Sequence, residues 1–222
     1  MIQSRIRALL RSALAAGGVG ALALGLSGSA SAASGGFAGY AATTSTYTSV
    51  NATWTQPSVT CGSASTYVST WVGLDGISDS TVEQIGTEAD CVNGVVAYEG
   101  WYELYPAAPV YLSQRLSPGD SVTATVSATT ADVFTLTLKD ATAGWTSSSK
   151  HTDTAAARTS AEVALEVPTV NGVTPVTGGT VTFTAAQVDG AALGAADPTL
   201  YTAPDASCGP LVGGTRFTCT WK

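Results

Sequence analysis

Two glutamates four residues apart, Glu162 and Glu166, are the first candidates for chemistry in this sequence. They lie in the segment Ser160–Val167, where acids and small residues alternate with larger apolar side chains until Pro168. If the segment is a strand, both carboxyl groups lie on one face with only the small Ala164 between them. Carboxyl groups presented together suit general acid–base chemistry. The plain alternative is a solvated outer face of a sheet.

Three further segments place aromatic, amide or acidic groups together on one face of an expected strand. The residues that share a face are Trp71, Gly73 and Asp75 in the first segment, Gln84, Gly86 and Glu88 in the second, and Glu99, Trp101, Glu103 and Tyr105 in the third. Glycine inside a strand often leaves room for a close ligand. Aromatic rings beside carboxyl groups on a concave sheet form a groove for an extended polymer, either a peptide or a sugar chain. The alternative is that the tryptophans are core residues and the acids solvate the rim.

The sequence offers little material for other kinds of active site. His151 is the only histidine, and it lies in a polar segment, residues 147–153, that we expect to be a loop. Serine or cysteine triads and histidine-rich metal sites are hard to build from one such residue. We therefore expect no metal and no cofactor, and any catalysis has to come from carboxyl and amide groups.

The first 32 residues have the features of a secretory signal peptide. A charged start, an apolar run and a small-residue cleavage pattern follow one another: Arg5, Arg7 and Arg11, then residues 12–26, then Ala30-Ser31-Ala32. We expect cleavage after Ala32, secretion of the mature chain, and a single domain over residues 33–222. The short, arginine-bearing signal and the Ala, Gly and Thr bias suggest a bacterial protein.

The charge of the mature chain excludes some partners. The whole sequence has a formal net charge of −7, and removal of the three signal arginines leaves six basic against sixteen acidic residues, or −10. An acidic surface argues against nucleic acid or an anionic membrane as a partner. It is compatible with a soluble monomer and with work at acidic pH.

Four cysteines in an exported chain are expected to form disulfides. Three pairings are possible. We favour Cys61–Cys91 and Cys208–Cys219, because each pair flanks a plausible hairpin or adjacent strands. A zinc site is a poor alternative, since the sequence contains no C-x-x-C spacing.

Short Thr- and Val-rich segments separated by turn signals predict an all-β fold, an antiparallel β-sandwich or jelly roll. The expected strands are residues 47–55, 65–74, 82–88, 95–105, 121–128, 133–140, 162–167, 180–185 and 216–221. Turn signals include Asp75-Gly76 and Asn93-Gly94. We expect the Ala- and Pro-rich segment 190–207 to be a long loop.

Taken in order, these motifs resemble those of one family, the glutamic peptidases or eqolisins. The matching segments are Trp71-Val72-Gly73-Leu74-Asp75-Gly76 (WVGIDG in the family), Gln84-Ile85-Gly86 (LQTG), Trp101-Tyr102-Glu103-Leu104-Tyr105-Pro106 (WYEWYP), the turn Ser117-Pro118-Gly119-Asp120, Ala161 to Glu166 (AExxxE), Gly179 to Phe183, and the ending with Cys208 and Cys219. The resemblance runs from about Gly39 to Lys222. Glu83 departs from it, because the family has an apolar residue before the glutamine, and Phe37 stands where the family has a tryptophan.

The resemblance implies a secreted, acid-acting endopeptidase with a concanavalin-A-like β-sandwich and a protein or peptide substrate. Gln84 and Glu166 would be the catalytic dyad, without metal or covalent intermediate. Four residues would support the dyad and line the substrate groove: Trp71, Asp75, Trp101 and Glu103. The alternatives are a lectin-like module that binds carbohydrate or peptide without catalysis, and a glycosidase that uses Glu103 and Glu166.

Overall fold

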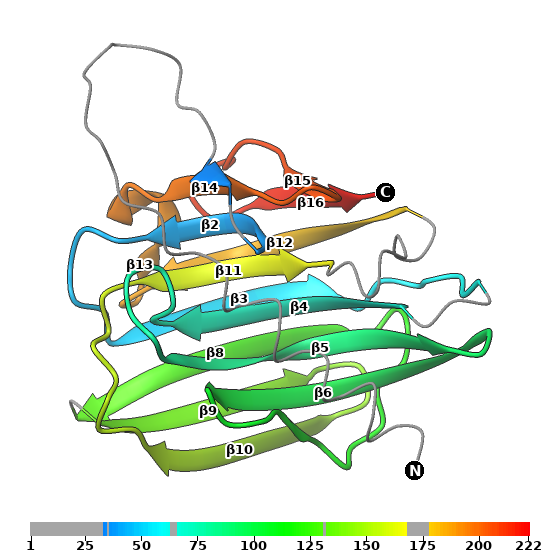
Figure 1. The fold of residues 1–222 in the computed structure, drawn as a ribbon, viewed down its shortest axis with the longest axis horizontal. Helices are drawn as coiled ribbons and strands as arrows, with labels where there is room; N and C mark the ends of the chain where they lie inside the picture. The colour runs from blue at the N-terminus through cyan, green and yellow to red at the C-terminus, as the bar shows by residue number, and fades with distance from the viewer. Residues whose placement is uncertain (1–32, 35, 63–65, 131, 168–177) are drawn as a thin grey trace.

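The computed structural model describes residues 33–34, 36–62, 66–130, 132–167 and 178–222, so the expected signal peptide lies outside the described residues. The chain forms two sheets that pack face to face (Figure 1). Their strand orders are β1-β14-β2-β11-β4-β5-β6-β7 in the first sheet and β10-β9-β8-β3-β12-β16-β15 in the second, with β13 beside β12. Apart from the parallel pair β1 and β14, the paired strands are antiparallel. The predicted antiparallel β-sandwich is therefore confirmed.

The strands of the first sheet are β1 (Ala33–Ser34), β14 (Thr199–Thr202), β2 (Ala38–Ala42), β11 (Ala161–Glu166), β4 (Thr66–Leu74), β5 (Val82–Val92), β6 (Val95–Tyr105) and β7 (Val110–Tyr111). The strands of the second sheet are β10 (Trp145–Thr152), β9 (Val133–Asp140), β8 (Ser121–Thr130), β3 (Ser49–Thr55), β12 (Gly179–Val188), β13 (Ala191–Ala192), β16 (Phe217–Trp221) and β15 (Ala206–Cys208). The described residues contain one short 3-10 helix, η2 (Leu193–Ala196).

Each of the nine expected strands overlaps one of these strands, but two expected loops were wrong. The polar segment around His151 is strand β10, which pairs with β9 along its whole length. The segment 190–207 contains β13, η2, β14 and the start of β15. Strand β10 carries little strand signal in the sequence, because it lies at the edge of its sheet and alternates between half-buried and exposed residues without a row of large apolar side chains.

The core between the sheets is built from one side of each strand. In β11, Val163 and Leu165 are fully buried in this core, together with Val72 and Ile85 from β4 and β5. Trp54 of β3 crosses the layer, where its indole Nε1 donates a 3.0 Å hydrogen bond to Thr87. Because side chains alternate along a strand, the other side of β11, β4, β5 and β6 faces away from this core.

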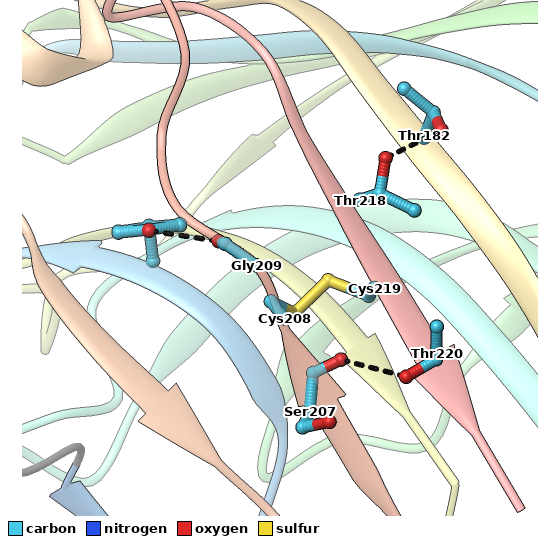
Figure 2. Close-up of a disulfide and its surroundings, with 8 residues drawn as sticks. Thr182, Ser207, Cys208, Gly209, Thr218, Cys219 and Thr220 are labelled. Atoms are coloured by element: carbon cyan, nitrogen blue, oxygen red, sulfur yellow. Dashed lines mark hydrogen bonds between the residues drawn. A yellow bond between two sulfur atoms is a disulfide. The ribbon is translucent and has the colours of Figure 1, made fainter.

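Both expected disulfides are present. Cys61 pairs with Cys91 on β5, and Cys208 on β15 pairs with Cys219 directly opposite it on β16. Figure 2 shows the second disulfide together with the hydrogen bonds between Thr182 and Thr218 and between Thr220 and Ser207, which join the same strands and β12. These links join the C-terminal strands β15 and β16 to each other and to β12.

In the part of the chain that the structure describes, no helix has the length and apolar character needed to span a bilayer.

Candidate active site

Four adjacent strands, β11, β4, β5 and β6, bring the sequence motifs together on the outer side of the first sheet (Figure 1). Their register aligns the side chains in three rows across the sheet. The middle row contains Ala164, Trp71, Gly86 and Trp101. Trp71, Trp101 and Ala164 belong to a small apolar cluster that is separate from the core between the sheets. The tryptophans are therefore buried, but on the side of the sheet that carries the acids.

Gly86 makes room for this row. A Cβ atom at this position would lie 2.6 Å from Cβ and 2.8 Å from Cα of Trp71, closer than real atoms approach. The glycine therefore lets the two flanking tryptophans, Trp71 on β4 and Trp101 on β6, pack against the strand between them. This agrees with the expectation that a glycine inside a strand permits a close approach.

The two outer rows contain the polar groups. One row runs from Glu162 through Gly73 and Gln84 to Glu103, and the other from Glu166 through Ser69 and Glu88 to Glu99. Glu162, Gln84, Glu166, Glu88 and Glu103 are all buried. The plain alternative of a solvated outer face is therefore wrong for Glu162 and Glu166.

Gln84 and Glu166 line the same small cavity. Its other lining residues are Ser69, Glu88, Trp101, Glu103 and Pro109. The Nε2 atom of Gln84 donates a 2.7 Å hydrogen bond to Oε2 of Glu103. This bond fixes the orientation of the amide, and it leaves the second N–H and the carbonyl oxygen of Gln84 for a ligand or a water molecule.

The Glu166 carboxyl group has an unusual affinity for protons. Burial and, to a smaller extent, the negative charge of Glu103 raise the pKa of Glu166, the indole N–H of Trp71 lowers it in part, and the result is a pKa of about 7. Only 6% of the Glu166 residue surface is exposed. A carboxyl group with a pKa near 7 can both accept and donate a proton in weakly acidic solution.

A further group of acids lies beside Glu88. Single carboxylate oxygens of Glu88, Asp90 and Glu99 lie within 4.8 Å of one another. Burial, followed by the charge of Asp90, raises the pKa of Glu88 well above its ordinary value. Three acidic side chains therefore lie close together at this end of the site.

Of the four predicted supporting residues, three lie at or near the cavity and one, Asp75, does not. Trp101 and Glu103 line the cavity, and Trp71 lies close enough to Glu166 to influence its pKa. Asp75 does not line the cavity. It is buried at the end of β4, where its carboxylate accepts hydrogen bonds from backbone N–H groups of Ala157 and Thr159.

Sequence reasoning missed two lining residues, Ser69 and Pro109. Ser69 lies two residues before Trp71, so the same alternation would have placed it on the outer face of the sheet. Pro109 belongs to the segment between β6 and β7, and no periodicity in the sequence marks its position.

A second, larger cavity lies away from the candidate dyad, where β6 and β7 meet the end of β10. Tyr102, Leu104, Pro106, His151 and Asp153 are among its lining residues. The ring centroids of Tyr102 and His151 lie 4.9 Å apart. None of the residues predicted for catalysis lines this cavity, so the smaller cavity is the candidate active site.

Comparisons with known proteins agree with this fold. A crystal structure of scytalido-glutamic peptidase with a transition-state analogue inhibitor matches with a TM-score of 0.71 and 26% identity, over 84% of this chain and 98% of that one. SCP-B, a member of the eqolisin family in complex with the tripeptide Ala-Ile-His, matches with a TM-score of 0.66 and 25% identity, over 84% of this chain and 98% of that one. Aspergilloglutamic peptidase from Aspergillus niger matches with a TM-score of 0.57 and 25% identity, over 70% of this chain and 99% of that one.

The fold and these structural matches therefore define a hydrolase of the glutamic endopeptidase class. Among sequences, aspergillopepsin-2 from Aspergillus niger is 30% identical over 44% of this chain, and the match spans 42% of that protein, less than half its length. The sequence profile of the peptidase A4 family matches residues 35–207, so the chain belongs to the peptidase A4 family.

Proposed function

We propose that this chain hydrolyses peptide bonds in proteins or peptides with Glu166 and Gln84 as its catalytic dyad. The observation that carries the proposal is that both side chains line one buried cavity, although they are distant in the sequence and come from different strands. The sequence also predicts a groove for an extended polymer on this face of the sheet, and the cavity lies on that face.

Glu166 has the properties of the group that moves protons. In the proposed reaction, ionised Glu166 removes a proton from a water molecule as the water oxygen attacks the carbonyl carbon of the peptide. When the C–N bond breaks, Glu166 returns this proton to the leaving amine. A pKa of about 7 places the carboxyl group in the range where both steps are possible.

Gln84 has the properties of the group that stabilises the oxyanion. It cannot titrate, but its amide N–H can donate to the carbonyl oxygen as negative charge develops there, while its own carbonyl oxygen holds the water. The hydrogen bond to Glu103 orients the amide before substrate arrives. Such preorganised donors are effective because no reorientation is needed during the reaction.

The buried tryptophans supply the walls of the proposed substrate groove. Trp101 lines the cavity, and Trp71 lies opposite it across Gly86 in the same row. The solved relatives hold a transition-state analogue inhibitor in one case and a tripeptide in another. We extend this preference for peptide ligands to the present chain.

We also propose that the protein is exported, with cleavage of the signal peptide after Ala32 and a single domain over residues 33–222. Two disulfides support this proposal, since structural disulfides persist in oxidising compartments outside the cytosol.

The test is cleavage of a denatured protein across acidic to neutral pH, with pepstatin present to suppress aspartic proteases. We expect Glu166→Gln and Gln84→Ala each to lose activity, with about 100- to 1,000-fold lower kcat for loss of the oxyanion donor. Circular dichroism and thermal melting of each variant show whether it is folded.

Full activity of a folded Glu166→Gln variant would contradict the proposed mechanism. Hydrolysis of polysaccharide by the wild type, lost in the same variant, would instead identify a glycosidase that uses Glu103 and Glu166. Retention of a sugar or peptide without turnover would identify a binding module.

A further inference from the structure

The larger cavity, where β6 and β7 meet the end of β10, has no part in the proposed reaction. Its volume is about 610 Å³, inside the range of about 300 to 1,000 Å³ that is typical of sites for small ligands. Its walls differ in chemistry. The lining from β6 and the connection to β7 is mainly apolar, whereas the lining from the end of β10 and the residues after it is polar.

The apolar wall is incompletely covered by the rest of the chain. Tyr102 and Leu104 are half-buried, and Val110 is 46% exposed. In the described part of the chain only two other large apolar side chains, Val95 and Val212, are exposed to such a degree. A ligand with an apolar group can therefore remove this wall from water, which favours binding.

The polar wall offers two hydrogen-bond acceptors. The ring of His151 lies against that of Tyr102, with centroids 4.9 Å apart, and its Nε2 atom is buried without a hydrogen-bond partner among the described residues. In a neutral imidazole one ring nitrogen is an acceptor. The carboxylate of Asp153 accepts a 2.9 Å hydrogen bond from the backbone N–H of Ala155 through Oδ1, and a carboxylate can accept several more.

The charge of this wall selects a positive ligand. Among the described residues that line the cavity, Asp153 is the only acid, and none is lysine or arginine. An ammonium group has three N–H donors and a positive charge, so it can donate to both the carboxylate and the imidazole nitrogen. The start of a peptide chain with an apolar first residue combines such an ammonium group with an apolar side chain.

We propose that the larger cavity binds the free N-terminus of an apolar peptide. Its α-ammonium group lies between Asp153 and His151, and its first side chain packs against the wall that contains Leu104 and Val110. Each peptide hydrolysis releases one product with a new α-amino group, so the products of this chain are ligands of this class. The source of the ligand rests on the proposed function, but the binding of the N-terminus does not.

The position of the cavity agrees with a product as its ligand. Strand β6 contributes to both cavities, because its side chains alternate between its two faces. Trp101 and Glu103 line the candidate active site, whereas Tyr102 and Leu104 line the larger cavity. The connection after β6 also reaches both, since Pro109 lines the candidate active site and the residues on either side of it line the larger cavity.

The experiment is a titration followed by NMR. His151 is the only histidine in the sequence, so protein prepared without a histidine tag gives one set of imidazole signals, and these report on this cavity. The probe is leucyl-alanine amide at pH 7.0, where most α-amino groups are protonated because their pKa is about 7.7 to 8.0. The matched probe is isocaproyl-alanine amide, the same molecule without the amino group.

We expect leucyl-alanine amide to shift the His151 signals to saturation, and isocaproyl-alanine amide to bind about tenfold more weakly, because it cannot make the charge-assisted hydrogen bond. Asp153→Asn keeps an oxygen for the N–H of Ala155 but removes the charge, so it should weaken leucyl-alanine amide about tenfold. Asp197→Asn, at an exposed residue outside the cavity, should leave the affinity unchanged.

A second pair of variants tests the apolar wall. Val110→Trp should fill part of the cavity and weaken both probes by about tenfold or more, as measured by the same titration. Val95→Trp is its matched control, since Val95 is 69% exposed and does not line the cavity.

Three results would overturn the proposal: no shift of the His151 signals at millimolar probe, equal affinities of the wild type for the two probes, or equal affinities of Asp153→Asn and wild type for leucyl-alanine amide. The titration needs no catalysis. If the wild type cleaves no peptide, the proposed function fails, and the titration still decides whether the cavity binds an N-terminus.

Discussion

The negative charge of Glu103 should set the lower pH limit of peptidase activity through its effect on Glu166. The two groups line the same cavity, and the charge of Glu103 is the second cause, after burial, of the raised pKa of Glu166. Glu103→Gln removes this charge but keeps a carbonyl oxygen that can accept the hydrogen bond from Gln84. The variant therefore separates the electrostatic role of Glu103 from its orienting role.

The size of the effect follows from the two causes of the shift. A like charge a few ångströms away raises a carboxyl pKa by about 1 to 3 units. Because burial is the larger cause here, and the variant leaves burial unchanged, we expect a decrease of about one unit from a starting value of about 7. The general base must be ionised, so activity falls as the pH falls through this pKa. A lower pKa therefore extends activity to lower pH.

The assay is kcat/KM for a fluorogenic peptide from pH 3 to pH 8, whose acid limb reports the pKa of the free enzyme's base. Glu88→Gln is the matched control, since Glu88 lines the same cavity but is not among the causes of the Glu166 shift. An acid limb that stays in place or moves to higher pH in Glu103→Gln would refute the electrostatic reasoning. So would an equal displacement in the control.

Three other predictions test the packing and the electrostatics of the site. Trp71→Phe removes the indole N–H that lowers the pKa of Glu166, so the acid limb of kcat/KM should move to higher pH; a shift to lower pH would contradict the assigned sign. Gly86→Ala should destabilise the fold by about 1–3 kcal/mol in urea unfolding because its Cβ would overlap Trp71, whereas Gly62→Ala, which meets no atom within 4 Å, should not. Removing the Cys61–Cys91 disulfide, which spans 30 residues, should cost about 3–4 kcal/mol of stability by the same measurement, and no change would mean that the loop is constrained without it.

Much of the fold could be predicted because the strands carry a local signal. The alternation in β11 separated Val163 and Leu165 from Glu162 and Glu166, and the structure places these pairs on opposite sides of the sheet. The Asn93-Gly94 turn has the positive φ angles expected of a hairpin, 53° and 77°, between β5 and β6. Strand β10 had no such signal, because an edge strand of Ser, Thr, Lys and His can be exposed on alternate residues without a large apolar row.

The sequence by itself determined which side chains share a face of each strand, because that depends only on the two-residue period of the backbone. The tertiary structure decided which strands are neighbours and in what register, and so brought Gln84 and Glu166 to one cavity with Ser69 and Pro109. It also decided that this face is buried. The raised pKa of Glu166 follows from that burial and from the charge of Glu103 on another strand, so no local pattern in the sequence could predict it.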